Sequence, residues 1–339
     1  MLQAMAGAEY GGAEAFFTRL CVALAKKGVE QRAVIRRHAA RAATLRGSGI
    51  ETTEVAFGGF FDRATTKRLR AEIDSFQPQI VLTWMNRATR FCPAKSSARH
   101  PFVHVARLGG YYNLKYYRRC DHLIANTHGI EDYLVGQDWD GGRVHYVPNF
   151  VASDKVPAQA RGELDTPEDA PLLLAVGRLH RNKAFDVLLE SLAALPECYL
   201  WLAGSGPEDS RLRSQAESLG VASRVRFLGW REDTPALYSA SDLLVCPSRH
   251  EPLGNVIVEA WAQGLPVVAA RSAGPEELIE DGVSGLLVAL EDAGALADGV
   301  RRALGDAALA VEGRKAYEST YTEAAVIERY RALFESLAA

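Results

Sequence analysis

The stretch RHEPLGNVIVEAWAQGLPVVAA, from Arg249 to Ala270, combines a polar turn, a helical pattern and an apolar run. The preceding segment DLLVCPS predicts a buried strand, and RHEPLG would form its exit loop. The run NVIVEAWAQG predicts a helix that ends at Gly264, and LPVVAA predicts the next strand. A strand, a helix and a second strand in this order predict one unit of a parallel sheet.

The same alternation of strand and helix patterns extends along the whole chain. At 339 residues the chain is too long for one typical core and fits two domains. A segment poor in apolar residues and rich in Pro and acid, Val151 to Pro171, predicts the linker between them. We therefore predict an α/β protein with two doubly wound parallel sheets that face each other across a cleft. Further strands are predicted at QIVLTW, PFVHVA, DHLIANT, RVHYVPN, PLLLAVG, CYLWLAG, RVRFLG and SGLLVAL.

Composition bounds the environment and the partners. The chain has no apolar run of the length that crosses a membrane, and its N-terminus predicts no secretory signal. Five scattered cysteines without a C-x-x-C pair indicate a reducing cytoplasm. The net charge of −3 hides an asymmetry: residues 1–150 hold 21 Lys and Arg against 13 Asp and Glu, and the remainder 18 against 29. A basic half indicates either an anionic partner or attraction between the two domains.

A candidate phosphate site follows the predicted strand PLLLAVG. Arg178 and Lys183 lie on the loop after this strand, close to a helix that begins near Ala184. Two cations beside the positive end of a helix dipole suit a diphosphate, although such a pair alone is more often solvated surface. Gly204 and Gly206 end the next strand, where a turn without side chains lets backbone approach a ligand. Asp209 stands where a dinucleotide fingerprint needs its third glycine, which argues against a nicotinamide cofactor.

The stretch from Arg249 to Ala270 contains two glutamates, Glu251 and Glu259. Glu251 would lie in the loop, and Glu259 about one turn inside the helix on a face that can turn toward the same ligand. The helix N-terminus at Gly254 and Asn255 offers backbone N–H groups to an anion. Carboxylates do not bind phosphate, so we interpret Glu259 as a ligand of a ribose diol and Glu251 as a ligand of sugar hydroxyls.

GRLHRNK followed by EPLGNVIVE resembles the retaining family 4 glycosyltransferases of the GT-B fold, including bacterial lipopolysaccharide-core enzymes. The likeness extends over most of the chain, through GGAE, GSGP, RVRFLGW, SDLLVCPS and AGPEELIEDGVSGLLV. It implies an acceptor-binding domain at residues 1–152, a donor-binding domain at 153–322, and a last helix within 323–339 that crosses back to the first domain. Expected activities are hexosyl transfer with retention from a UDP- or GDP-linked sugar or, as alternatives, an epimerase or phosphorylase on this fold, or nucleotide-sugar binding without activity.

The resemblance also implies roles for individual residues. Arg178, Lys183 and Glu251 would be catalytic, with the two cations on the donor diphosphate and Glu251 on the transferred sugar. Glu259 would bind the ribose, and no metal or other cofactor is expected. The remaining donor contacts would come from backbone or from the surroundings of the base: Gly12, Gly204, Leu228, Arg231, Leu253, Gly254, Asn255 and Val256. The D-x-D pattern at Asp138 to Asp140 lies in a glycine-flanked loop and is not expected to bind metal.

Candidate acceptor residues lie in the first half. Glu14 follows two glycines at a predicted helix start, where it could orient an acceptor or serve the helix dipole. Arg107 stands where relatives usually have a histidine, which puts that histidine's contact with the donor sugar in doubt. Tyr111 and Tyr112 open YYNLKYYRRC, whose aromatic and basic residues suit a sugar, an anionic lipid-linked acceptor or an anionic membrane surface, or else an ordinary packed helix. No nucleic-acid motif accompanies the basic half.

Overall fold

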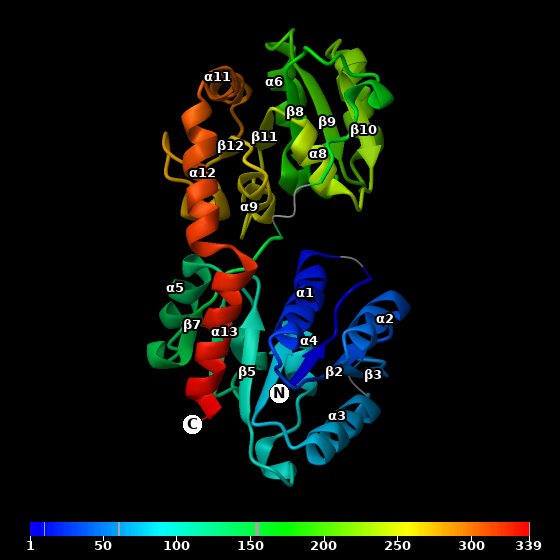
Figure 1. The fold of residues 1–339 in the computed structure, drawn as a ribbon, viewed down its shortest axis with the longest axis vertical. Helices are drawn as coiled ribbons and strands as arrows, with labels where there is room; N and C mark the ends of the chain where they lie inside the picture. The colour runs from blue at the N-terminus through cyan, green and yellow to red at the C-terminus, as the bar shows by residue number, and fades with distance from the viewer. Residues whose placement is uncertain (10, 60–61, 153–155, 339) are drawn as a thin grey trace. The chain divides into compact units, whose positions relative to one another are not determined.

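The computed structural model describes residues 1–9, 11–59, 62–152 and 156–338, which form two compact units (Figure 1). Unit 1 contains Met1–Phe150 and Glu323–Ala339, and unit 2 contains Val151–Thr322. Each unit is built on one parallel sheet with helices on both faces. The predicted α/β class with two doubly wound sheets is confirmed.

The sheet of unit 1 has the strand order β3-β2-β1-β4-β5-β6-β7. Its strands read as apolar runs because both faces are covered. In β4, Ile80, Leu82 and Trp84 pack on one face, whereas Val81 packs on the other. The strands are β1 (Leu2–Met5), β2 (Arg32–Arg36), β3 (Glu51–Val55), β4 (Ile80–Trp84), β5 (Val103–Leu108), β6 (His122–Ala125) and β7 (Val144–Tyr146).

Helices cover both faces of this sheet. Helices α1 (Gly12–Lys26), α2 (Ala39–Gly47) and α13 (Glu323–Ala338) bury their apolar sides on one face. Helices α3 (Arg63–Phe76) and α4 (Met85–Phe91) cover the other, and α5 (His128–Gly136) packs there beside β6. The described part of unit 1 also contains the 3-10 turns η1 (Lys95–Ser97), η2 (Leu114–Tyr116) and η3 (Gly141–Arg143).

The sheet of unit 2 has the order β10-β9-β8-β11-β12-β13, with β8 and β11 at its centre. The chain winds outward in one direction from β8 to β10 and in the other from β11 to β13, so the winding reverses between β8 and β11. The strands are β8 (Leu172–Val176), β9 (Tyr199–Ala203), β10 (Val225–Gly229), β11 (Leu243–Cys246), β12 (Val267–Ala270) and β13 (Leu286–Val288).

Helices also cover both faces of this second sheet. One face carries α6 (Phe185–Ala193), α7 (Asp209–Ser218) and α11 (Ala293–Leu304). The other carries α8 (Thr234–Ala240), α9 (Asn255–Ala262), α10 (Ala273–Leu278) and the Tyr317 end of α12 (Ala307–Thr320). Its 3-10 turns are η4 (Arg161–Leu164), η5 (Arg181–Lys183) and η6 (Ala222–Arg224).

Most of the segment that was predicted as a linker, Val151 to Pro171, belongs to unit 2. Most of its described part packs on unit 2, where Arg161 donates hydrogen bonds to the carbonyl of Ala240 (2.8 Å) and to Asp242 (2.9 Å). Trp201 Nε1–H donates to Thr166 Oγ1 at 2.9 Å. The polar side chain of Arg161 instead satisfies backbone carbonyls just before the amino ends of the central strands β8 and β11.

Candidate functional site

A group of charged residues that includes Lys183 and Glu251 lies in unit 2 where the winding of the sheet reverses. Ligands of open α/β sheets bind at this point, outside the carboxyl ends of the strands. The loop after β8 leads into η5 and ends with Lys183, and the loop after β11 carries Glu251. Because β8 and β11 are neighbours in the sheet, these loops meet although the residues are far apart in sequence.

Lys183 and Glu251 form an ion pair in which Lys183 Nζ donates to Glu251 Oε2, and their side chains are 23% and 11% exposed. Burial alone would lower the pKa of Lys183, but the Glu251 carboxylate outweighs this effect and raises the pKa above its ordinary value. Glu251 also accepts weaker hydrogen bonds from Ser248 Oγ and from the N–H of Gly254. The sequence analysis assigned the two residues to different parts of one ligand and did not predict this pair.

Glycines allow the loops beneath the pair to approach each other. Gly204 has φ 151°, and a Cβ on it would lie 1.8 Å from the carbonyl oxygen of Gly177. Its N–H donates to the carbonyl of Gly229, so the ends of β8, β9 and β10 meet around this residue. A Cβ on Gly206 would lie 2.3 Å from the carbonyl oxygen of Leu179. These glycines therefore serve close packing of the site loops.

Arg178 differs from Lys183 in its surroundings. It follows Gly177 directly, and its side chain is exposed. Within the part of unit 2 that the structure describes, no carboxylate pairs with it. The site thus contains one cation held by Glu251 and one cation open to solvent, as expected for residues that bind an anionic ligand.

Helix α9 begins beside Glu251. Its N-cap Gly254 takes the left-handed conformation, with φ 78°, and the N–H of Gly274 donates to the carbonyl of Glu251 at 2.7 Å. On the same helix, Glu259 accepts a hydrogen bond from Tyr238 Oη at 2.9 Å. Tyr238 is buried, and burial together with the nearby Glu259 raises the pKa of its hydroxyl. Contact of Glu259 with a ribose, and of Leu253, Asn255 and Val256 with the donor, stays a prediction.

The residues expected near the base lie at the end of β10 and just after it. Leu228 is partly buried against the core on the α8 and α9 face. Arg231 pairs with Asp233, with its Nε 2.7 Å from Oδ1, and donates to Gln159 Oε1 at 3.1 Å. The sequence predicted neither partner of Arg231.

Sequence reasoning missed Arg249, which connects the two site loops. Its guanidinium contacts both oxygens of Asp186 at 2.7 and 3.0 Å and donates to Glu291 Oε2 at 2.8 Å. It also donates to the carbonyl of Arg181, two residues before Lys183. These ion pairs hold the pKa of Asp186 below its usual range despite burial, and they raise that of Arg249. A charged residue two positions before Glu251 was the only sequence signal available.

The candidate ligand residues of unit 1 differ in burial and in their contacts. Glu14, 8% exposed, accepts the N–H of Ala8 at 2.7 Å, so its carboxylate holds the loop before α1. Gly12 is the exposed first residue of that helix. Tyr111 is exposed and packs edge-on against Tyr133. Tyr112 is partly buried, and its carbonyl accepts a hydrogen bond from Tyr133 Oη.

Arg107 and the segment after Tyr112 differ in their surroundings from the other candidates. Arg107 is only 2% exposed; its Nε donates to Tyr330 Oη at 2.7 Å and its Nη2 to Asn149 Oδ1 at 2.5 Å. It holds α13 against the rest of unit 1, and its contact with an acceptor stays a prediction. The segment after Tyr112 contains only the 3-10 turn η2 and not the regular helix considered as an alternative, and Tyr117 is fully buried there.

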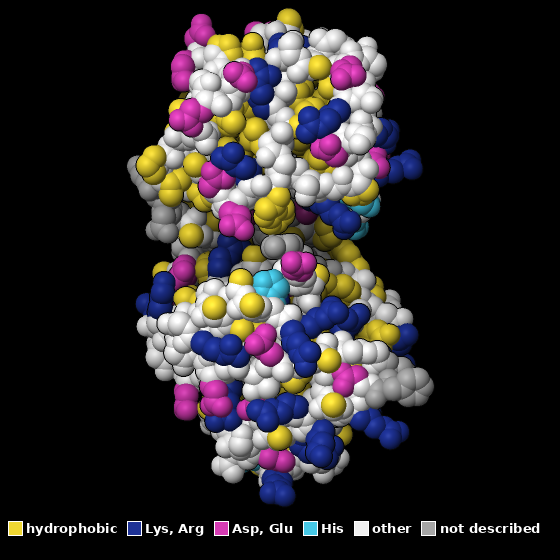
Figure 2. All heavy atoms as spheres, turned by 90° about the vertical axis from the view of Figure 1, so that its right-hand side faces the viewer, with side chains coloured by type: hydrophobic (Ala, Val, Ile, Leu, Met, Phe, Trp, Pro, Cys, Tyr) yellow, Lys and Arg dark blue, Asp and Glu magenta, His cyan; other side chains and the backbone are white. Residues whose placement is uncertain are grey.

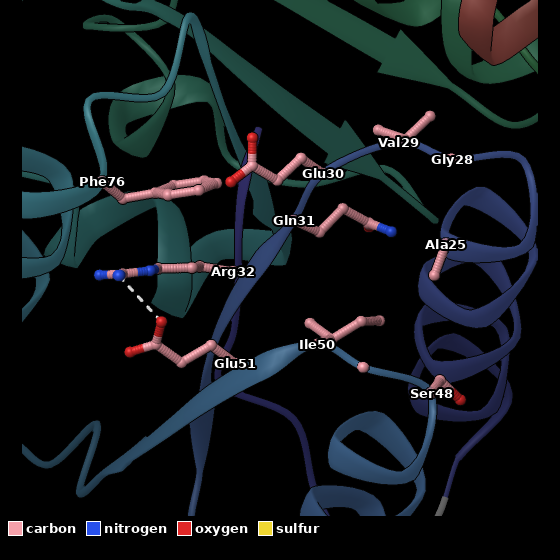
Figure 3. A pocket seen from close by; sticks show the side chains of 11 residues that line it. Ala25, Gly28, Val29, Glu30, Gln31, Arg32, Ser48, Ile50, Glu51 and Phe76 are labelled. Atoms are coloured by element: carbon pink, nitrogen blue, oxygen red, sulfur yellow. Dashed lines mark ion pairs between the residues drawn. The ribbon is translucent and has the colours of Figure 1, made fainter.

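Three other features bear on ligand binding: possible metal ligands, the D-x-D pattern and a pocket in unit 1. In the described part of the chain, no three His, Cys, Asp or Glu side chains gather as a metal site. The D-x-D residue Asp140 instead caps η3 by accepting the N–H of Gly142. A pocket of about 450 Å³ lies at the amino ends of β2 and β3, the end of the sheet opposite the usual ligand side (Figure 3). It is lined by Phe76 and by Arg32, which pairs with Glu51 at 2.8 Å.

Comparisons with known proteins agree with this geometry. Residues 10–155 match the family model "Glycosyltransferase Family 4", and residues 170–306 match "Glycosyl transferases group 1". The fold resembles that of Anabaena HepE, solved in complex with UDP and glucose, with a TM-score of 0.83 and 21% identity over 99% of both chains. The two family models identify a glycosyltransferase, and the likeness to solved structures shows the GT-B fold, as predicted.

Sequence relatives narrow this class. The chain is 37% identical to the lipopolysaccharide core biosynthesis glycosyltransferase LpsE of Rhizobium meliloti over 96% of both chains. It is 33% identical to LpsD of the same organism, over 96% of this chain and 95% of that one. The chain belongs to the family 4 glycosyltransferases.

Proposed function

We propose that this glycosyltransferase moves a hexose from a UDP- or GDP-linked sugar to a glycan or glycolipid acceptor in lipopolysaccharide core synthesis. The identity to LpsE and LpsD along nearly the whole chain supports this acceptor class. The observation that carries the donor class is the Lys183–Glu251 pair with exposed Arg178 on the loop that leads to it. This set offers cations to a diphosphate and a carboxylate to sugar hydroxyls.

The proposed chemistry is departure of a nucleoside diphosphate from a sugar that develops positive charge. Arg178 and Lys183 stabilise the negative charge that grows on the β-phosphate, and N–H groups at the start of α9 add to this stabilisation. We propose that these donors act without a metal ion. We assign Glu251 to the sugar hydroxyls and not to nucleophilic attack, because its ion pair with Lys183 makes the carboxylate a weaker nucleophile. The acceptor hydroxyl then attacks the anomeric carbon on the face from which the diphosphate leaves and gives its proton to an oxygen of the departing diphosphate, so the anomeric configuration is retained.

We place the reaction in the cytoplasm, at the inner face of the cytoplasmic membrane. Among the residues described, no helix combines the length and apolar character that a bilayer span requires. The excess of Lys and Arg in residues 1–150 favours peripheral contact with anionic lipid. Vesicle co-sedimentation that does not respond to salt or to anionic lipid would contradict this contact.

Thermal unfolding with UDP, GDP, ADP and CMP tests the donor class first. A nucleotide at 100 times its Kd should add about 2.7 kcal/mol to the free energy of unfolding. The matching nucleotide sugars are then supplied with lipopolysaccharide core acceptor, with and without a chelator, and NMR of the product reports the anomeric configuration. No nucleotide-dependent shift and no product with any of these donors would contradict the proposed function. An inverted product or loss of activity with the chelator would contradict the mechanism alone.

A further inference from the structure

A second candidate ligand site lies entirely within unit 1. A cavity of about 550 Å³ opens at the carboxyl ends of β1 and β2 and is lined by residues 7–9 and 36–40. This is the end of a parallel sheet at which ligands bind, and β1 adjoins β4, where the winding of this sheet reverses. None of the residues assigned above to the donor or to the acceptor lines the cavity.

The cavity presents positive groups to solvent. Arg36 and Arg37 line it with exposed side chains, and neither pairs with a carboxylate in the described part of unit 1. Helix α2 begins at the same place, so the N–H groups of Ala39 and Ala40 in its first turn have no partner within the helix. Lys and Arg side chains gather more widely on the face of unit 1 that carries α2 and α3 (Figure 2).

His38 gives the cavity a fixed wall. Its Nδ1 accepts the N–H of Arg41 at 3.1 Å, which places the ring proton on Nε2. That Nε2–H donates to the carbonyl of Glu9 at 3.0 Å. The side chain therefore ties the loop after β1 to the start of α2 before any ligand arrives.

A buried arginine lies behind this wall. Arg41 is 6% exposed, and its Nη2 donates to the carbonyls of two lining residues, Ala8 (3.1 Å) and Glu9 (3.4 Å). Its Nη1 is buried without a hydrogen-bond partner in the described structure. A buried, incompletely satisfied cation raises the affinity of the neighbouring cavity for negative charge.

Acidic groups reduce the positive charge without cancelling it. The Glu9 side chain lines the cavity, and Glu14 acts electrostatically on Arg41. Glu54 accepts the N–H of His38 at 3.0 Å but is balanced by Arg46 at 3.3 Å. Arg36, Arg37, Arg41 and the helix N-terminus thus oppose the charges of Glu9 and Glu14.

We propose that this cavity binds an anionic group of the acceptor, a phosphate or a carboxylate. The inference rests on the proposed function, because the cations of unit 2 serve the donor diphosphate and leave the cations of unit 1 for a different anion. Arg36 and Arg37 provide charge-assisted, forked hydrogen bonds, and the first turn of α2 provides backbone N–H groups.

The test compares the double variant Arg36→Gln/Arg37→Gln with Arg63→Gln/Arg70→Gln, which removes two exposed arginines from α3 and equals it in charge. Delipidated core oligosaccharide is the acceptor, so membrane contact does not contribute. We expect the KM for acceptor to rise about tenfold or more in the first variant only, with the KM for donor unchanged. The same rise in both variants, or in neither, would overturn the proposal.

Two further arms separate the possible failures. Inorganic phosphate at constant ionic strength should raise the Tm of the wild type more than that of the Arg36→Gln/Arg37→Gln variant, a result that does not depend on transferase activity. Equal stabilisation of both would count against the site even if transfer proceeds. Dephosphorylated oligosaccharide identifies the anion: if its KM no longer depends on the two arginines, the group is a phosphate, and if it still depends on them, the group is a carboxylate.

Discussion

Lys183 and Glu251 pair across the loops that follow β8 and β11, the two central strands of unit 2. The second cation that we assign to the donor diphosphate, Arg178, is exposed. A carboxylate beside the cation keeps Lys183 protonated and in place, whereas Arg178 has no such restraint. The two cations should therefore respond differently to mutation although both serve one ligand.

We predict that Arg178→Ala and Lys183→Ala each lower kcat by about 10²- to 10³-fold, because each removes a donor to the leaving diphosphate. Only Lys183→Ala should also lower the free energy of unfolding, by about 1–3 kcal/mol, since it leaves the Glu251 carboxylate largely buried and unpaired. Steady-state kinetics and urea denaturation measure the two effects. Near-normal turnover in both variants would refute their catalytic assignment.

This pair also affects stability at alkaline pH. The folded-state pKa of Lys183 is raised, so its contribution is complete below the unfolded value of 10.5 and is lost as pH rises through the folded value. Denaturation of wild type and Lys183→Met should therefore converge above about pH 10.5. A constant difference between them up to the folded-state pKa and beyond would indicate that the contribution of Lys183 is packing of its aliphatic stem.

Arg249 should act as a positioning residue. Arg249→Lys removes the two-point contact with Asp186 and the link to the backbone before Lys183. Because small displacements of catalytic groups are costly, we expect kcat/KM for the donor to fall about 10²-fold. Arg271→Lys is the matched control, since Arg271 pairs with Asp281 on the same unit at 2.7 Å. Equal losses in both variants would show a general charge effect and not positioning.

Gly204→Ala tests the close approach of the loops under the site. The new Cβ would overlap the carbonyl oxygen of Gly177 at a backbone angle that favours glycine, so we expect a loss of stability of about 3 kcal/mol or more and loss of nucleotide binding. Gly220→Ala, with φ 69° and no atom within 4 Å, should cost only about 1 kcal/mol. Calorimetry with and without nucleotide separates the two; equal costs would show that steric overlap is not the cause.

The fold was largely predictable because local patterns determine it. Apolar runs such as PLLLAVG and QIVLTW predicted strands, which lie in the middle of the two sheets, and a glycine marked the end of the predicted helix at Gly264. The same local signals were too weak to describe the segment after Tyr112, where Tyr117 is buried without a regular helix. Tertiary packing decides such short segments more than residue preference does.

The site was predictable as a set of residues but not as a set of contacts. Glu251 was assigned to a sugar and Lys183 to a phosphate, yet only the strand order brings them together. The partners of Arg249 lie 63 positions before it and 42 positions after it, and no local pattern connects them. Long-range pairs of this kind require the topology before they can be predicted.

His104 should make the stability of the fold depend on pH in the acidic range. It is buried on β5 beside Thr83, and burial lowers the pKa of its ring from 6.5 to about 4. The unfolded chain therefore takes up this proton first, and stability falls by about 3 kcal/mol as pH falls from 6.5 to 4. Relative to wild type, His104→Gln should make the urea midpoint depend less on pH over this interval. An unchanged slope in His104→Gln would exclude this residue as the cause.

A variant of Tyr330 can show whether Arg107 has a structural role or a role in ligand binding. Its Nε donates to Tyr330 of α13, and its guanidinium lies 4.7 Å from the centre of the Phe16 ring and 4.8 Å from that of Trp84. Tyr330→Phe removes one acceptor from a buried cation and should cost about 1–3 kcal/mol, with the KM for acceptor unchanged. Tyr111→Phe, at an exposed ring, is the control and should leave stability within about 0.5 kcal/mol. If Tyr330→Phe instead preserves stability but raises the KM for acceptor, Arg107 belongs to the acceptor site, as its place in the sequence first indicated. A loss of stability alone would mean that Arg107 serves to attach the last helix to the rest of unit 1.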